Sequence, residues 1–298
     1  METATANEAK TRPDVYALVT DKIIERLNAG TVPWRKPWKD AGMPRNLISG
    51  KPYRGINSLL LGMEGYEHNL FLSFDQVKKI GGKVRRGSKG HSIVYWNVPP
   101  EKQEDERTEA TEEGKKSHPS LWYYTVFNVS QCDNLPERYL PAGRQPDRIP
   151  AADAIIRNMP KCPRVRHKEQ RAYYHVIEDY VNMPKRRSFR TEAGYYSTLF
   201  HELVHSTGHD SRLARDGVVE MSEFGDEMYS KEELVAEIGT CYLLALANIE
   251  GEFANSAAYI QGWLGKLRND KRLIVKAAGQ AQKAVDYILN ARSEKDEA

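Results

Sequence analysis

The segment Phe200-His201-Glu202-Leu203-Val204-His205 places two imidazoles four residues apart, with a carboxylate beside the first. On a helix, residues i and i+4 lie on one face, so both histidines can bind one metal ion. Catalytic zinc sites use three protein ligands and keep one position for water. Glu202 would lie close to that position as general base. The spacing therefore predicts a zinc-dependent peptidase site, with another divalent metal possible.

The third metal ligand is not supplied by the residues that directly follow the second histidine. In the metzincin pattern, a histidine or aspartate lies six residues after that histidine, and a glycine lies three residues after it. Gly208 fits this spacing, but Ser211 occupies the ligand position. Protein zinc ligands are Cys, His, Asp or Glu side chains, so the metzincin arrangement fails at Ser211.

A better source of the third ligand is the segment Ser230-Lys231-Glu232-Glu233-Leu234-Val235-Ala236-Glu237. It resembles the second helix of gluzincins, in which the first Glu of a Glu-x-x-Ala-acid pattern binds the metal. The resemblance implies that Glu233 is the metal ligand. It also implies that Glu237 orients one of the ligand histidines by a hydrogen bond to the ring nitrogen that does not bind the metal. Ser230 and Glu233 also have the spacing of a capping box, in which case Glu237 would be the ligand. Glu232 is expected to be solvated.

Two further features bear on the chemistry of this site. A tetrahedral oxyanion needs a hydrogen-bond donor, and Tyr229 and His209 are candidates. Residues 164–181 alternate enough to predict a hairpin, whose edge would suit an extended peptide substrate. His167 and His175 on that hairpin are expected at the surface.

Aromatic residues are interspersed among basic residues in the first half of the chain. Residues 34–54 hold six bases and one acid, and residues 78–89 hold six bases and no acid. Bases that follow a phosphate backbone, combined with exposed aromatic rings, are typical of single-stranded nucleic-acid binding. The residues expected to contact DNA are Trp34, Arg35, Lys36, Trp38, Lys39, Tyr53, Arg54, Lys83, Arg85, Arg86 and Lys89. Trp34, Trp38 and Tyr53 are expected to be exposed, because the Pro, Lys and Arg around them disfavour burial.

Two runs rich in β-branched and aromatic residues, 92–98 and 121–129, predict strands. In the second run, Trp122, Tyr124 and Val126 alternate with Tyr123, Thr125 and Phe127, so one of the two sets is expected to be buried. Residues 101–118 between the strands hold seven acids, four bases and no large apolar side chain, which predicts a flexible insert.

The helices and strands expected to position these residues indicate an α+β fold with two domains. Helices are expected at 13–29, 57–63, 73–80, 151–158, 191–207 and 230–247, and helical structure throughout the last fifty residues. Residues 1–12 are expected to be disordered, and 13–135 to form a small α+β nucleic-acid-binding domain. Four prolines in 136–150 predict a linker, and 151–298 a mostly helical zincin-like domain.

The bulk composition of the 298 residues is that of a globular protein, with 40% hydrophobic and 29% charged residues and a net charge of +3. The three cysteines, Cys132, Cys162 and Cys241, are far apart and in no C-x-x-C spacing. This favours reduced thiols and a cytoplasmic location. The first residues contain no apolar segment typical of a signal peptide, and no stretch is apolar enough to span a bilayer. No membrane partner is expected, and the oligomeric state is left open.

Several segments, in order along residues 13–247, resemble the ArdC-type antirestriction proteins of conjugative plasmids. They are PWRKPW, NLISGKPYRGINSLLL, LSFDQVKKIGGKVRRGSKG, YYTVFNVSQCDNL, FHELVHSTGHDSRLARD and YSKEELVAEIG. The N-terminal domain of that family also occurs in plasmid-encoded primases. The resemblance implies a single-stranded-DNA-binding domain followed by a zincin-like metallopeptidase domain. It also implies a role in protecting incoming plasmid DNA from host restriction.

Two hypotheses about function follow. In the first, the protein is an enzyme that cuts a host protein at the entering DNA strand. In the second, it coats or occludes single-stranded DNA, and the metal site is structural or not needed for protection. Intact Glu202 favours the first, because a purely structural metal site needs no general base. A priming enzyme is disfavoured, since no paired-carboxylate or zinc-cysteine signature is present.

Overall fold

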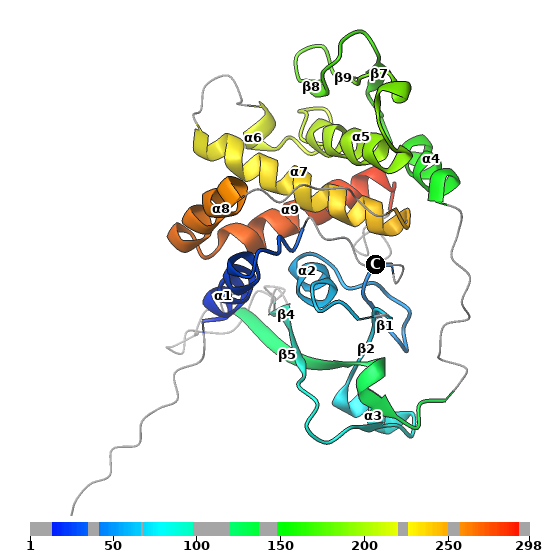
Figure 1. Cartoon of the computed structure of the whole chain (residues 1–298), viewed down its shortest axis with the longest axis vertical. Helices are drawn as coiled ribbons and strands as arrows, with labels where there is room; N and C mark the ends of the chain where they lie inside the picture. The colour runs from blue at the N-terminus through cyan, green and yellow to red at the C-terminus, as the bar shows by residue number, and fades with distance from the viewer. Residues whose placement is uncertain are drawn as a thin grey trace, which may run out of the picture.

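The computed structural model of the chain describes residues 14–34, 42–66, 68–97, 120–136, 148–219, 226–249 and 257–291. Its architecture is α+β with two domains, as expected from the sequence. Figure 1 shows the strands of the first half at one end of the molecule and the helices and short strands of the second half at the other, with α1 (Val15–Asn28) and α2 (Ile56–Gly62) between them. The expected disordered N-terminus and acidic insert, and most of the expected linker, lie outside the described residues.

The first half is built on a four-stranded sheet of order β1-β2-β5-β4. Its strands are β1 (Arg45–Asn46), β2 (Leu70–Ser73), β4 (His91–Asn97) and β5 (Ser120–Asn128). Strands β4 and β5 are antiparallel, with His91 opposite Val126 and Tyr95 opposite Trp122. Helices α1 (Val15–Asn28), α2 (Ile56–Gly62) and α3 (Phe74–Lys79) accompany the sheet, and β3 (Lys83–Val84) pairs with β6 (Cys132–Asp133).

The second half is mostly helical. Its helices are α4 (Arg148–Asn158), α5 (Glu192–Ser206), α6 (Asp216–Val219), α7 (Asp226–Leu246), α8 (Ala257–Asn269) and α9 (Leu273–Ile288). The last fifty residues were expected to be helical throughout, but α8 and α9 are separate helices. No helix among the described ranges is long and apolar enough to cross a membrane.

The hairpin expected at residues 164–181 is wrong in its pairing. The segment and its neighbours form three short strands, β7 (Arg164–Arg166), β8 (Tyr173–His175) and β9 (Tyr180–Asn182), in the order β7-β9-β8. Only β8 and β9 are antiparallel neighbours, whereas β7 pairs with β9 in parallel. Strand β8 therefore lies at an edge of this sheet, which matters because it borders the candidate site.

The largest hydrophobic cluster joins the two halves, and the first half has two smaller clusters of its own. Helix α1 buries Val15, Val19, Ile23 and Leu27 at helical spacing, and these belong to the same cluster as the buried faces of α7 and α9. Burying each such aliphatic side chain contributes about 1.5–3 kcal/mol relative to leaving it exposed. The periodicity that makes α1 a helix therefore also fixes the first half against the second.

Candidate metal centre and nucleic-acid surface

Helix α5 is positioned by its cap and by close packing against α7. The Thr191 side chain accepts a hydrogen bond from the Gly194 amide at 3.0 Å and so begins the helix. Opposite it on α7, a Cβ added at Gly239 would lie 2.9 Å from a methyl carbon of Val204. Any side chain at Gly239 would push the two helices apart, so this glycine permits the approach that brings their polar groups together.

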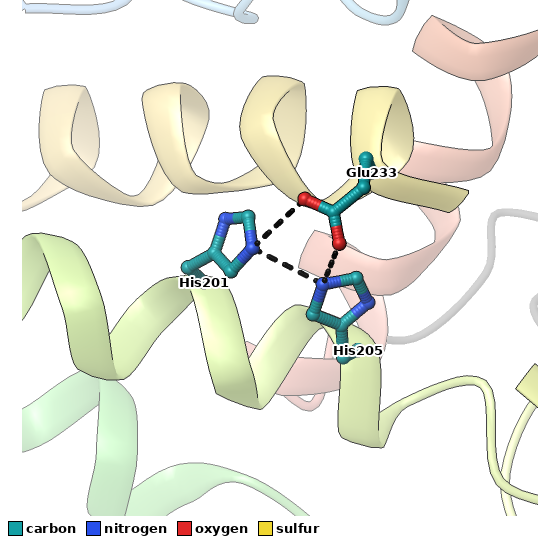
Figure 2. A group of neighbouring side chains, drawn as sticks. All are labelled: His201, His205 and Glu233. Atoms are coloured by element: carbon teal, nitrogen blue, oxygen red, sulfur yellow. Dashed lines mark hydrogen bonds and ion pairs between the residues drawn. The ribbon is translucent and has the colours of Figure 1, made fainter. Parts of the chain in front are cut away.

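Three side chains from α5 and α7 converge at this contact, as Figure 2 shows. His205 Nε2 lies 3.1 Å from His201 Nε2 and 3.3 Å from Glu233 Oε1, and His201 Nε2 lies 3.5 Å from Glu233 Oε2. His201, His205 and Glu233 each offer one ligand atom, and these atoms lie within 4.8 Å of one another. The structure thus brings together the three residues that the sequence suggested as metal ligands.

The spacing of these atoms fits a tetrahedral ion. Two donors bound at about 2.1 Å to such an ion stand roughly 3.4 Å apart, close to the 3.1 Å between the two imidazole nitrogens, and each of these nitrogens faces its own oxygen of Glu233. Imidazole nitrogens with one carboxylate are a donor set of catalytic zinc sites. The residues present therefore fit a divalent metal.

The charged forms of His205 and of the glutamates next to it stabilise one another. Burial lowers the pKa of His205, but hydrogen bonds to Glu232 and Glu233 outweigh it and raise the pKa to about 10. Burial raises the pKa of Glu233, and hydrogen bonds from both histidines reverse this and hold its pKa well below the usual range. The carboxylate of Glu233 is thus ionised, as a metal ligand must be.

Glu202 is buried beside the cluster, with 8% of its surface exposed. Burial raises its pKa, partly offset by the charges of His205 and His201, and the backbone amide of Tyr174 lies against the carboxylate. A pocket of about 220 Å³ opens here, lined by Ala172, Tyr173, Tyr174, His201, Glu202, His205, Val218, Glu232 and Glu233. A buried carboxyl with a raised pKa next to a pocket has the environment of a general base.

The carboxylate that lies against Nδ1 of His205 is that of Glu232, a residue that was expected from the sequence to be exposed to solvent. Glu232 is 4% exposed, and its Oε1 lies 3.3 Å from His205 Nδ1. Arg215 donates to both oxygens of Glu232 and also to Thr207 Oγ1 and the Val204 carbonyl. The expectation of a solvated Glu232 is wrong, because the buried Arg215 guanidinium compensates its charge. Nothing in the local spacing distinguished Arg215 from a surface arginine.

Glu237 has a different partner from the one implied by the gluzincin pattern. Its Oε2 accepts a hydrogen bond from Trp34 Nε1 at 2.8 Å, while His205 Nδ1 is held by Glu232. Trp34 is fully buried and meets Trp263 edge to face, with ring centroids 5.9 Å apart. The expectation that Trp34 is an exposed DNA contact is therefore wrong. The Glu237 side chain thus reaches Trp34 of the first half.

The capping-box alternative for Glu233 also fails. Helix α7 begins at Asp226, so Ser230 lies inside the helix rather than at its N-cap. Of the oxyanion candidates, His209 bonds to Ser211 and Asp210 and is not among the pocket residues, and the side chain of Tyr229 lies outside the described part. Tyr174 borders the pocket, but its hydroxyl donates to Asp179.

Apart from Trp34, the expected DNA contacts fall into three groups. Arg35, Lys36, Trp38 and Lys39 lie outside the described residues. Tyr53 is half-buried against Phe71, and Arg54 forms an ion pair with Asp286 of α9, so both contribute to packing between elements. The remaining four bases are exposed and lie on β3 and on the loop between β3 and β4; Lys83, Arg85, Arg86 and Lys89 are together called here the basic loop. Arg85 approaches Asp133 at 3.5 Å, with both side chains about half exposed.

Strand β5 departs from the expectation that one of its two faces is buried. Trp122, Tyr123 and Tyr124 are 39%, 44% and 55% exposed, and Thr125 is also exposed. Burial begins only at Val126, where β5 joins β2. The β4–β5 hairpin thus extends beyond the sheet core with aromatic side chains on both faces.

Comparison with known proteins matches both halves of the chain. Residues 13–127 match the family described as the N-terminal domain of anti-restriction factor ArdC, and residues 150–280 match the zincin-like metallopeptidase family. Two crystal structures of the antirestriction ArdC protein from the R388 plasmid, one metal-free and one Mn(II)-bound, are 42% identical, each with a TM-score of 0.73. They align over 92% and 93% of this chain and 96% and 97% of theirs.

Longer proteins match as well. The chain is 35% identical to a DNA primase TraC of Escherichia coli over 94% of its own length, but it spans only 27% of that primase. An uncharacterized protein of Sinorhizobium fredii, y4eC, is 32% identical and is covered over 94% of its length. The zincin-like match indicates a divalent metal, and the Mn(II)-bound relative leaves its identity open.

Proposed function

Because this chain belongs to the ArdC antirestriction family, we propose that it protects incoming plasmid DNA from host restriction. In this proposal, the first half binds single-stranded DNA without sequence preference. The second half is a metal-dependent peptidase, with zinc or another divalent ion held by His201, His205 and Glu233. Its substrate would be a host protein met at the entering strand.

The observation that carries the proposal is the position of Glu202. A structural metal site needs ligands only, whereas here a buried carboxyl with a raised pKa lies beside the ligand cluster in a pocket open to solvent. Binding of the metal by its three ligands alone requires no carboxylate at this inward-facing position. A glutamate there suits proton transfer.

The residues of the pocket suit peptide hydrolysis. A bound divalent ion would supply Lewis acidity toward the scissile carbonyl. Glu202 takes the proton of the attacking water and then gives it to the leaving amide nitrogen. Glu232 orients the His205 ring through Nδ1, and Arg215 holds Glu232 in turn. Strand β8 borders the pocket at a sheet edge, where an extended peptide could add as a strand.

Support for the DNA-binding half comes from its surface charge. The segment Phe74–Lys89 contains six bases and one acid, and the four bases of the basic loop are exposed. Such a surface binds phosphates with an affinity that falls steeply with salt. A match to part of a primase does not extend priming activity to this chain.

A second candidate function is occlusion of DNA without proteolysis. It is favoured by the basic loop and exposed hairpin, which would bind DNA whether or not Glu202 acts. The two functions differ in what they require of the metal centre.

Substitution of Glu202 by glutamine separates them. Glu202→Gln keeps the volume and the three ligand residues, so metal content and fold should be retained while hydrolysis is lost. Asp210→Asn is the matched control, since Asp210 is 74% exposed at its side chain and lies outside the pocket. The measurement is the survival of transferred plasmid DNA in a restricting recipient. Loss of protection by Glu202→Gln alone supports the peptidase account, and full protection by it leaves only occlusion.

A further inference from the structure

One face of the β4–β5 hairpin carries three exposed aromatic rings. Tyr95 pairs with Trp122 and Ile93 with Tyr124, and side chains of paired residues share a face. Tyr95, Trp122 and Tyr124 therefore lie on one face, called here the aromatic platform, and Tyr123 lies on the other. The rings of Tyr95 and Tyr124 are 6.2 Å apart. All three platform residues are at least 39% exposed.

The exposed basic loop directly precedes β4, the strand that carries Tyr95 of the platform. Lys89 precedes β4 by two positions, and Tyr95 follows four residues after His91 on the same strand. The six residue steps from Lys89 to Tyr95 span about 20 Å of extended chain. The chain thus leads from a cluster of exposed basic side chains to a set of stacking surfaces within a length that a few nucleotides can cover.

Charge and ring chemistry together select the occupant of this surface. Aromatic rings on a sheet that is flanked by bases can stack unpaired nucleobases while Lys and Arg contact phosphates. In duplex DNA the faces of the bases are already stacked on their neighbours, so they are not free for Tyr or Trp rings. An apolar protein partner would gain nothing from the adjacent excess of bases.

We propose that single-stranded DNA runs from the basic loop along β4 and stacks bases on Tyr95, Trp122 and Tyr124. This inference rests on the proposed function of the first half and says where that binding occurs. It relocates the stacking surface from Trp34, which is buried between the domains, to the hairpin.

The test is the affinity of the full-length protein for an oligo(dT) strand, measured by fluorescence anisotropy over a salt series. Each stacked base contributes about fivefold in affinity at the lower end of the known range, so the triple variant Tyr95→Ala/Trp122→Ala/Tyr124→Ala should bind roughly 100-fold more weakly. The slope of log affinity against log salt should not change, since no phosphate contact is removed. The triple Phe variant at the same positions keeps the rings and should bind within about threefold of the parent.

Controls separate this inference from the proposed function. Tyr123→Ala removes an equally exposed ring from the opposite face and should leave affinity unchanged. If the parent protein shows no affinity for the single strand, DNA binding itself is refuted. If the parent binds and the triple Ala variant binds as tightly, or if Tyr123→Ala is the harmful change, the platform is wrong while DNA binding stands.

Fluorescence gives a readout that does not depend on the Ala variant folding. Stacking of a base on Trp122 should quench its emission, so adding oligo(dT) should quench the parent protein more than Trp122→Phe. Equal quenching of the two would overturn the assignment of Trp122.

Discussion

Replacing Glu232 by glutamine changes the one carboxylate that joins His205 to a buried arginine. Glutamine keeps the shape of the side chain, but it removes the negative charge facing the Arg215 guanidinium, whose side chain is 6% exposed. Leaving one charge of a buried pair uncompensated costs about 3–5 kcal/mol of folding free energy. Loss of the carboxylate behind a metal-binding histidine also lowers metal affinity about 10- to 100-fold.

The two effects are separated by a second variant. Glu232→Gln/Arg215→Met removes the buried charge together with its partner, so most of the lost stability should return. Metal affinity should stay 10- to 100-fold below that of the parent, because His205 Nδ1 still lacks its carboxylate. Stability is measured by urea unfolding without metal, and metal affinity by competition with a chelating dye. A double variant that binds metal within threefold of the parent would refute the role given to Glu232.

Three further outcomes are expected. Burial raises the pKa of Glu64, but hydrogen bonds from His91 and Lys22 outweigh it and lower the pKa to about 2. Because the folded-state pKa is depressed, this carboxylate stabilises the protein above pH 4.5 by at most about 3 kcal/mol and loses that effect as the pH falls toward 2. Unfolding midpoints of Glu64→Gln and the parent should therefore differ at pH 7 and converge at low pH. Trp34→Ala should cost about 3–5 kcal/mol in urea unfolding, whereas an exposed ring would cost less than about 0.5 kcal/mol. Since the pKa of His205 is about 10 without metal, metal binding at pH 7 should release about one proton, seen as a dependence of calorimetric enthalpy on the ionisation enthalpy of the buffer.

The elements of the fold were largely predictable because their signals are local. Helices were expected at residues 13–29 and 191–207, and α1 and α5 agree with these ranges within two residues. In the structure, Asp14 and Thr191 cap their N-termini. The pairing of β7 with β9 was not predictable in the same way. Strands β7 and β9 are neighbours in the sheet, but β8 lies between them in the sequence, so their parallel pairing depends on the tertiary arrangement. The alternation of side chains is the same whether β7 pairs with β8 or with β9.

The site was predictable only as far as its motif extends. The spacing of His201 and His205 fixes their shared helix face, and the Glu-x-x-Ala pattern suggested Glu233. The surroundings depend on contacts between distant segments. Glu232 is buried because Arg215 reaches it from a loop, and Trp34 is buried because the first domain packs against α7. The local sequence predicted that both side chains are exposed to solvent, because their partners, Arg215 and Glu237, are distant in the sequence.

The most direct test of the metal centre is a crystal structure of the protein soaked in a divalent metal, with anomalous scattering recorded at the metal edge. One peak is expected between α5 and α7, about 2.1 Å from His201 Nε2, His205 Nε2 and a Glu233 oxygen. Glu202 should face the remaining coordination position without binding the metal. A peak held by Glu237 instead of Glu233, or no peak at these histidines, would contradict the account.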